Sequence, residues 1–160
     1  MTREEAGFRG AVAFFSPGWP RDSFPNGIIT YVDAMREGLR ALGTRAIVLT
    51  RAMRPECAEP DVIDVLPDGP RSFAARVRGR LIGAREARWR DLTTNIVREL
   101  QRLRREQDVR VFEMEETFGL AGRVARESPV PVVQNSGTEA ISSRSRSVAS
   151  SVMSGAVGCR

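Results

Sequence analysis

Residues 11–15 read Ala-Val-Ala-Phe-Phe, an unbroken apolar run with the length of a short strand. Such runs are typical of strands that are buried on both faces in a parallel sheet. Residues 16–27 follow with three prolines and two glycines, which indicates a loop. Apolar residues then recur at helical spacing over residues 28–42, between Asn26 as N-cap and Gly43 as closing glycine. We therefore expect a central strand that leads through a loop into an amphipathic helix.

The rest of the chain continues this alternation of strands and helices. Strand-like runs lie at residues 46–49, 62–66, 109–114 and 130–133. Helical periodicity covers residues 71–105, with a break near residues 83–90. The pattern predicts an α/β fold, with a Rossmann-like, doubly wound, mostly parallel sheet of about five strands and right-handed crossovers.

A further helix is expected after the fourth strand. Glu115 and Glu116 are predicted in its first turn, and Arg123 and Arg126 in its last, an order that suits the helix dipole. Pro131 within the fifth run indicates an edge strand or a strand start.

The composition divides the chain into three parts. Residues 1–10 are expected to form an N-terminal extension, residues 11–138 an incomplete Rossmann-like domain, and residues 139–160 a disordered tail rich in Ser and Arg. Residues 141–160 hold seven serines and no acidic residue, whereas residues 1–140 hold five serines. We expect this tail to bury no apolar face.

The basic residues exclude several kinds of chemistry. All 25 are Arg, since the sequence contains neither Lys nor His. This excludes Ser-His-Asp and Cys-His catalysis, His-based metal sites and a Walker A lysine. A GC-rich gene predicts the same bias without any functional selection. The two cysteines, Cys57 and Cys159, are too few for a zinc ribbon and favour a cytoplasmic protein without disulfides.

Two candidate binding segments follow predicted strands at one edge of the sheet. The loop 16–27 ends at Asn26 and Gly27, where a helix N-terminus offers backbone amides, although the dinucleotide motif is missing. Glu113, Glu115 and Glu116 close the fourth strand, where carboxylates suit sugar hydroxyls or general-base work. The alternatives are a plain connector and charges that merely favour a helix N-terminus.

A third candidate is the basic segment 71–105, with eleven Arg against three acidic residues. A solvated helix face explains it most simply, and an anionic membrane surface is the functional alternative. The candidate contacts to a membrane or another anion are Arg76, Arg80, Arg85 and Arg88. Nucleic acid is a disfavoured partner, because no recognised nucleic-acid-binding motif accompanies the arginines.

The chain resembles the start of a GT-B, family 4 type glycosyltransferase. The likeness rests on the strand at residues 11–15, the loop ending Asn26-Gly27, the helix closed by Gly43 and the strand ending Leu49-Thr50. Asn26 stands where the family has the first of two glycines. The acidic strand end at residues 113–116 and the strand at residues 129–133 also match, so the resemblance covers about residues 8–134.

The resemblance implies the acceptor-binding half of a retaining hexosyltransferase that needs no metal or other cofactor. Gly27 would lie against the donor diphosphate or the acceptor, and Glu113, Glu115 and Glu116 would line the acceptor side. The implied partners are a nucleotide-sugar donor, a sugar or lipid-linked acceptor, the inner face of the membrane and a separate donor-binding subunit. The family pattern stops near residues 134–140, so we expect a truncated or frameshifted product that is inactive alone.

Two other functions stay open at this point. One is a non-enzymatic peripheral module that binds anionic membrane through residues 71–105. The other is a flavodoxin-like domain with a small nucleotide ligand, since a fold does not fix a function.

Overall fold

The computed structural model describes residues 8–66, 83–116 and 119–135. Its centre is a five-stranded, all-parallel sheet in the order β3-β2-β1-β4-β5, which confirms the predicted doubly wound α/β architecture. The strands are β1 (Ala11–Ser16), β2 (Arg45–Thr50), β3 (Val62–Asp64), β4 (Val109–Glu115) and β5 (Val132–Asn135). The helices are α1 (Gly27–Ala41), α3 (Ala84–Gln107) and α4 (Leu120–Glu127), with short 3-10 turns η1 (Arg21–Ser23) and η2 (Pro55–Cys57).

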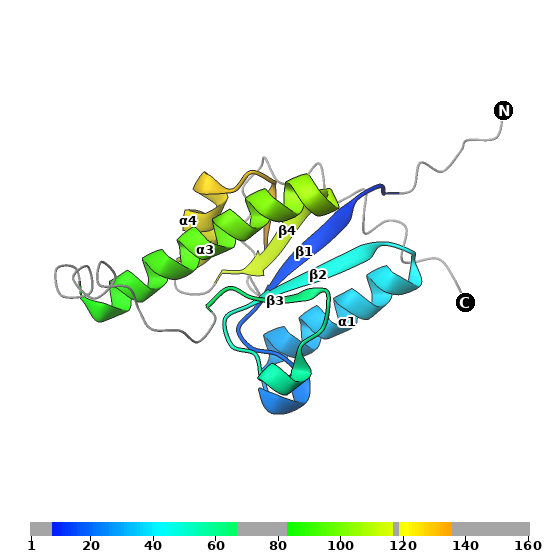
Figure 1. Cartoon of the computed structure of the whole chain (residues 1–160), viewed down its shortest axis with the longest axis horizontal. Coiled ribbons are helices and arrows are strands. Elements are labelled where there is room, and N and C mark those ends of the chain that lie inside the picture. Colours follow the sequence, from blue (N-terminus) through cyan, green and yellow to red (C-terminus); the bar gives the residue numbers. More distant parts are fainter. Residues whose placement is uncertain (1–7, 67–82, 117–118, 136–160) are drawn as a thin grey trace.

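The helices form a layer on each face of the sheet (Figure 1). Side chains alternate along β1, so Phe14 packs with Ile29 and Val32 of α1, while Ala13 and Phe15 face α3 and α4. The α3 side holds the larger cluster, to which α3 contributes Leu92, Ile96, Leu100 and Leu103. The four residues repeat at three- and four-residue spacing, so the whole apolar stripe of α3 is buried against the sheet.

The predicted ends of α1 are confirmed. The side chain of Asn26 accepts a hydrogen bond from the backbone amide of Ile28 at 2.8 Å, as an N-cap does. Beyond the helix, Gly43 adopts φ +73°, a left-handed conformation that favours glycine. The helix therefore begins at the carboxyl-terminal edge of the sheet, which places Gly27 and Tyr31 beside the end of β1.

The helix α3 continues through most of the stretch where the sequence predicts a break. It runs from Ala84 to Gln107 directly after Gly83, which has φ +85°, and it contains neither Gly nor Pro. The expected interruption over residues 83–90 is therefore wrong beyond its first residue. Leu92 and the half-buried Trp89 pack in the same core cluster as the rest of the stripe, which carries the helix through this stretch. The helical pattern expected over residues 71–82 lies outside the described residues.

The prediction for Glu115 and Glu116 is also wrong. Glu115 is the last residue of β4 and pairs with Asn135 of β5, so the parallel ladder extends the strand past the expected helix start. Glu116 follows the strand, and α4 begins only after Gly119. Arg126 lies in the last turn of α4 as expected, whereas Arg123 lies a turn earlier and pairs with Glu86 of α3 at 2.8 Å.

Pro131 stands just before β5, and β5 is an edge strand of the described sheet, as the proline predicts. Most of the expected N-terminal extension, residues 1–7, and the Ser/Arg tail lie outside the described residues.

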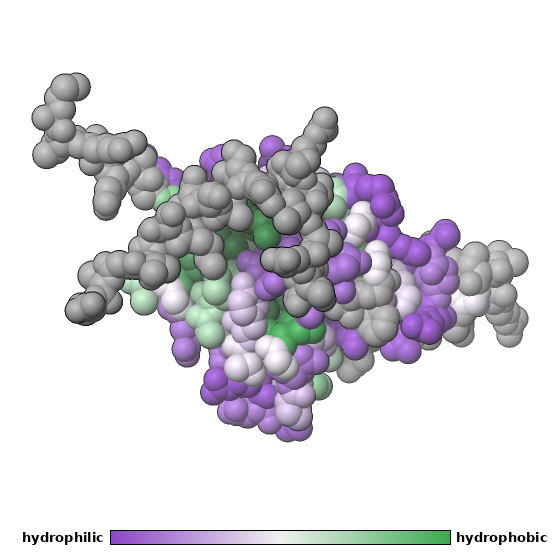
Figure 2. All heavy atoms as spheres, turned by 180° about the vertical axis from the view of Figure 1, so that it is seen from behind, coloured by the Kyte–Doolittle hydropathy of each residue, from purple (hydrophilic) through white to green (hydrophobic). Residues whose placement is uncertain are grey.

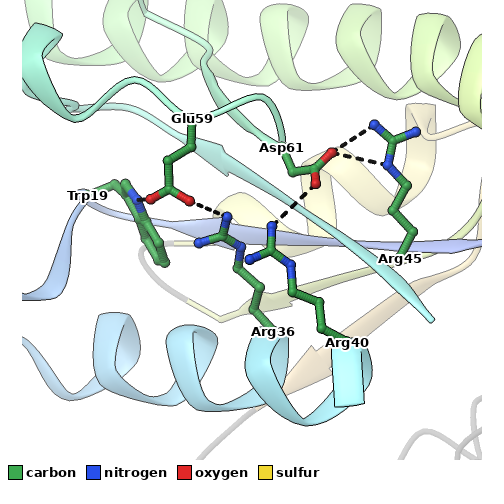
Figure 3. Close-up of polar contacts among 6 residues, drawn as sticks. All are labelled: Trp19, Arg36, Arg40, Arg45, Glu59 and Asp61. Carbon is green, nitrogen blue, oxygen red and sulfur yellow. Dashed lines mark hydrogen bonds and ion pairs between the residues drawn. The ribbon is translucent and has the colours of Figure 1, made fainter. Parts of the chain in front are cut away.

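Arg36, a buried residue of α1, contacts residues of two loops (Figure 3). Arg36 is 4% exposed; its guanidinium pairs with Glu59 and lies 5.1 Å from the centroid of the Trp19 ring. Trp19 donates from Nε1 to the same carboxylate at 3.1 Å. Asp61 adds a second pair of contacts, to Arg40 at 3.3 Å and to Arg45 at 2.7 Å. These contacts fix the β1–α1 loop and the segment before β3 against the helix.

Candidate functional site

A cleft opens at the carboxyl-terminal edge of the sheet, between the ends of β1 and β4. The chain leaves β1 towards β2 and leaves β4 towards β5, so the connections diverge at this point. In doubly wound sheets such a switch point is the usual ligand position. The cleft has a volume of about 180 Å³, and its polar side chains are Tyr31, Glu113, Glu115 and Asn135.

Strand register brings the polar groups together. Glu113 pairs with Phe14 of β1, and Glu115 lies two residues further along β4, so both side chains share the face of the sheet that carries α1. Asn135 pairs with Glu115 in the neighbouring strand and therefore lies beside it. Tyr31 reaches the same place from α1, one turn after Gly27. The remaining lining is mostly apolar and includes Phe14, Phe15 and Met114.

The closest polar contact joins α1 to β4. The Tyr31 hydroxyl donates to Oε1 of Glu113 at 2.6 Å. Burial raises the pKa of Glu113 above its usual range, and hydrogen bonds from Tyr31 and Asn135 offset part of that rise. The pKa of Tyr31 is raised as well, first by burial and then by the bond to Glu113 and its negative charge. Tyr31 therefore stays a neutral donor, while Glu113 is a proton acceptor with an elevated pKa.

Glu115 leaves one carboxylate oxygen without a partner. Its Oε2 is buried and makes no hydrogen bond within the described residues. A buried, unsatisfied acceptor is costly, more so when it carries charge. A donor supplied by a bound molecule would remove that cost.

Three of the five predicted substrate-binding residues line the cleft, namely Gly27, Glu113 and Glu115. Asn26 instead uses its side chain to cap α1, and Glu116 follows β4 without lining the cleft. A Cβ added at Gly27 would meet no atom within 4 Å, so a side chain can be introduced at this position without a clash.

Tyr31 and Asn135 are the site residues that sequence reasoning missed. Tyr31 is the single tyrosine of the chain and stands four residues after Gly27, so helical spacing puts both on one side of α1. Asn135 closes the last strand at the edge where Glu113 and Glu115 end theirs. The spacing of Tyr31 and the position of Asn135 can both be read from the sequence, but neither shows that these side chains contact the cleft glutamates.

The basic segment lies at another part of the molecule. Arg76 and Arg80 are outside the described residues, while Arg85 and Arg88 are exposed near the start of α3. That end of the molecule is hydrophilic, on the right of Figure 2. Trp89, half-buried, packs against the core with Arg51 5.9 Å from its ring centroid. The apolar residues of the described part of this segment thus face the sheet.

Within the three described ranges, no cluster of three or more His, Cys, Asp or Glu side chains is arranged to hold a metal ion. Among the helices of those ranges, none combines the length and apolar character needed to cross a membrane.

Comparison with known proteins identifies no family for this chain. No protein family matches the chain, and no curated protein is significantly similar to it. Two crystal structures of the C-terminal domain of a hydrogenase from Pyrococcus furiosus are similar in structure. They share 14% and 13% identity with this chain, at TM-scores of 0.43 and 0.45. The alignments cover 79% of this chain and 91% and 90% of theirs, and likeness at this level carries no statement about function.

Proposed function

We propose that the cleft binds the acceptor sugar of a glycosyl transfer, and that this chain is the acceptor-side half of a GT-B, family 4 type enzyme. One observation carries the proposal: Tyr31, Glu113, Glu115 and Asn135 converge in a single cleft at the switch point of the sheet. Carboxylates, an amide and a phenol are suited to the several hydroxyl groups of a sugar, which both donate and accept. The two carboxylates disfavour a phosphate group, and hence a nucleotide, at this position.

The elevated pKa of Glu113 suits the removal of a proton from the attacking hydroxyl of the acceptor sugar. A sugar hydroxyl that attacks an anomeric carbon must give up its proton as the new C–O bond forms. The bond to the nucleotide diphosphate breaks on the same face of the donor sugar, as retention of configuration requires, and the diphosphate leaves with the electron pair. A carboxylate whose pKa is raised by burial is a better proton acceptor than an exposed one. Glu113 would take this proton, and Tyr31 would orient its carboxylate through the 2.6 Å bond.

The nucleotide-sugar donor belongs to a second half in this proposal. The cleft offers no cationic side chain in the described residues, so it has no group to stabilise a departing diphosphate. A separate donor-binding partner would supply that group, and the described chain alone would bind acceptor without transferring sugar.

The test is a titration of the full chain with neutral mono- and disaccharides, followed by NMR or calorimetry. Gly27→Trp introduces a large side chain at a residue that lines the cleft and should weaken sugar binding at least about tenfold. Gly38→Trp is the matched control, because Gly38 lies on the same helix, is exposed and likewise has open space around its Cβ. Its affinity should equal that of the parent chain.

Sugar binding that Gly27→Trp leaves intact would remove the cleft from the site. Binding of none of the sugars would count against the acceptor-half function as a whole. UDP- and GDP-sugars should bind no better than the corresponding free sugars.

Membrane binding is the weaker proposal. The apolar stripe of α3 is buried against the sheet, so only its exposed arginines, such as Arg88, can meet a lipid headgroup. Several other arginines of this helix are paired, as Arg90 is with Glu86 at 3.1 Å. Co-sedimentation with anionic liposomes that falls steeply with salt would support this function, and salt-independent or absent binding would argue against it.

A further inference from the structure

The cleft is acidic in a chain rich in arginine. Its lining includes Glu113 and Glu115, and none of its described residues is cationic. Elsewhere in the described ranges, partly buried carboxylates are neutralised by arginine. These are Asp33 with Arg21, Glu59 with Arg36, Asp61 with Arg40 and Arg45, Glu86 with Arg90 and Arg123, and Glu99 with Arg102. The two cleft glutamates thus lack the counter-charge that most of their counterparts have.

The unsatisfied oxygen of Glu115 is an independent sign of a missing donor. Glu115 lines the cleft, and its buried Oε2 has no hydrogen-bond partner among the described residues, whereas Glu113 already accepts from Tyr31 at 2.6 Å. A neutral hydroxyl can satisfy such an oxygen, but an ammonium group adds the attraction between two opposite charges to the hydrogen bond. The combination of an orphaned oxygen and two uncompensated charges therefore favours a cation over a neutral donor.

The wall of the cleft formed by the start of α1 is electropositive, whereas the wall that carries Glu113 and Glu115 is electronegative. Gly27 and Ile28 begin α1, whose N-terminus carries a partial positive charge of about half a unit. That end attracts ligand oxygens. A complementary ligand carries oxygen atoms on one side and a positive group on the other, within about 180 Å³.

We infer that the ligand of this cleft is an amine-bearing polyol, such as an amino sugar, whose protonated amine lies beside Glu115 while one hydroxyl group contacts Glu113. Its other hydroxyl groups face the start of α1 and the apolar floor at Phe14. This inference rests on the proposed acceptor function and narrows it to one class of acceptor.

The test compares D-glucosamine with D-glucose, which differ by an ammonium group in place of one hydroxyl. The full chain should bind glucosamine about tenfold more tightly, the lower end of the gain expected when an ion pair replaces a hydrogen bond from a neutral hydroxyl to the same carboxylate. N-acetylglucosamine, which keeps the nitrogen but loses the charge, should bind no more tightly than glucose. These three titrations use the parent chain and need no variant to fold.

Two variants test whether the preference for glucosamine over glucose depends on Glu115. Glu115→Gln keeps the shape of the side chain and should reduce the glucosamine-to-glucose affinity ratio to near one. Glu37→Gln is the matched control, because Glu37 is exposed on α1, lies outside the cleft lining and changes the net charge equally. Its ratio should remain about tenfold.

The outcomes separate the two proposals. Equal binding of glucose and glucosamine at a site that Gly27→Trp blocks overturns the amine inference and leaves the acceptor function standing. A preference that persists in Glu115→Gln, or in Gly27→Trp, also overturns the inference, because the amine then lies elsewhere. If neither glucose nor glucosamine binds, the acceptor function and the amine inference are both overturned.

Discussion

Glu113 is the residue on which the chemistry of the cleft depends. Burial raises its pKa in the folded chain, while the unfolded chain keeps a glutamate value of about 4.3. Between these two values the folded state binds more protons than the unfolded state, so stability falls as pH rises through the interval. Above the raised pKa the loss is complete and the free energy of unfolding no longer responds to this group.

Glu113→Gln should remove this component of the pH dependence. The variant keeps an oxygen that can accept from the Tyr31 hydroxyl, but it cannot ionise. The free energy of unfolding of the variant, minus that of the parent chain, should therefore increase as pH rises from about 4 to above the raised pKa. Urea unfolding at a series of pH values measures the difference. Glu127→Gln, an exposed change on α4, controls for the altered net charge. A difference that stays constant with pH would contradict the role of burial.

The buried guanidinium of Arg36 depends on Glu59 for its counter-charge. Glu59→Ala removes the carboxylate that faces a 4% exposed guanidinium, and should cost about 2 kcal/mol in urea unfolding. Adding Arg36→Met removes the stranded charge while keeping much of the side-chain volume beside Trp19. The double variant should thus be more stable than Glu59→Ala alone. Strictly additive losses would show that the two residues do not depend on each other.

At the scale of the element, α1 connects the fold to the cleft. Its first residue, Gly27, and its fifth, Tyr31, both line the cleft, so the position of the helix start sets where they lie. Asn26 determines that start through its bond to the amide of Ile28. Its role in the structure is that of a cap, and any effect on ligand binding follows from the placement of the helix.

Asn26→Ala should lower the free energy of unfolding by about 1 kcal/mol, the usual cost of losing an N-cap side chain. Asn26→Asp keeps an accepting oxygen and should stay within a few tenths of a kcal/mol of the parent chain. Thermal or urea unfolding of the three proteins checks this order. Equal stability of Asn26→Ala and Asn26→Asp would contradict the capping role.

The ends of β4 and α3 show where reasoning from local sequence fails. The pair Glu115-Glu116 has the composition of a helix start, yet pairing with β5 keeps Glu115 in the strand. Local charge preferences contribute a few tenths of a kcal/mol to about 1 kcal/mol, so a tertiary ladder easily outweighs them. In α3, burial of a long apolar stripe likewise carries the helix through the arginines near residue 88.

For the molecule as a whole, the doubly wound parallel sheet and the central place of β1 were predictable. Apolar runs of strand length alternate with helical stretches, and right-handed crossovers leave few topologies. Gly27, Glu113 and Glu115 could be placed at one sheet edge for the same reason. The contact between Tyr31 and Glu113 could not, because the two residues lie 82 positions apart and meet only through the packing of α1 on the sheet. Asn135 depended similarly on the register of β5.

A polyhydroxylated acceptor that binds at the switch point of this sheet should be detectable by amide chemical-shift mapping of the ¹⁵N-labelled full chain, titrated with a neutral sugar. We expect saturable shifts concentrated at Gly27, Tyr31, Glu113, Glu115 and Asn135, and their loss in Gly27→Trp but not in Gly38→Trp. Shifts that instead centre on Arg85 and Arg88 of α3, or no saturable shifts at any sugar concentration, would contradict this expectation.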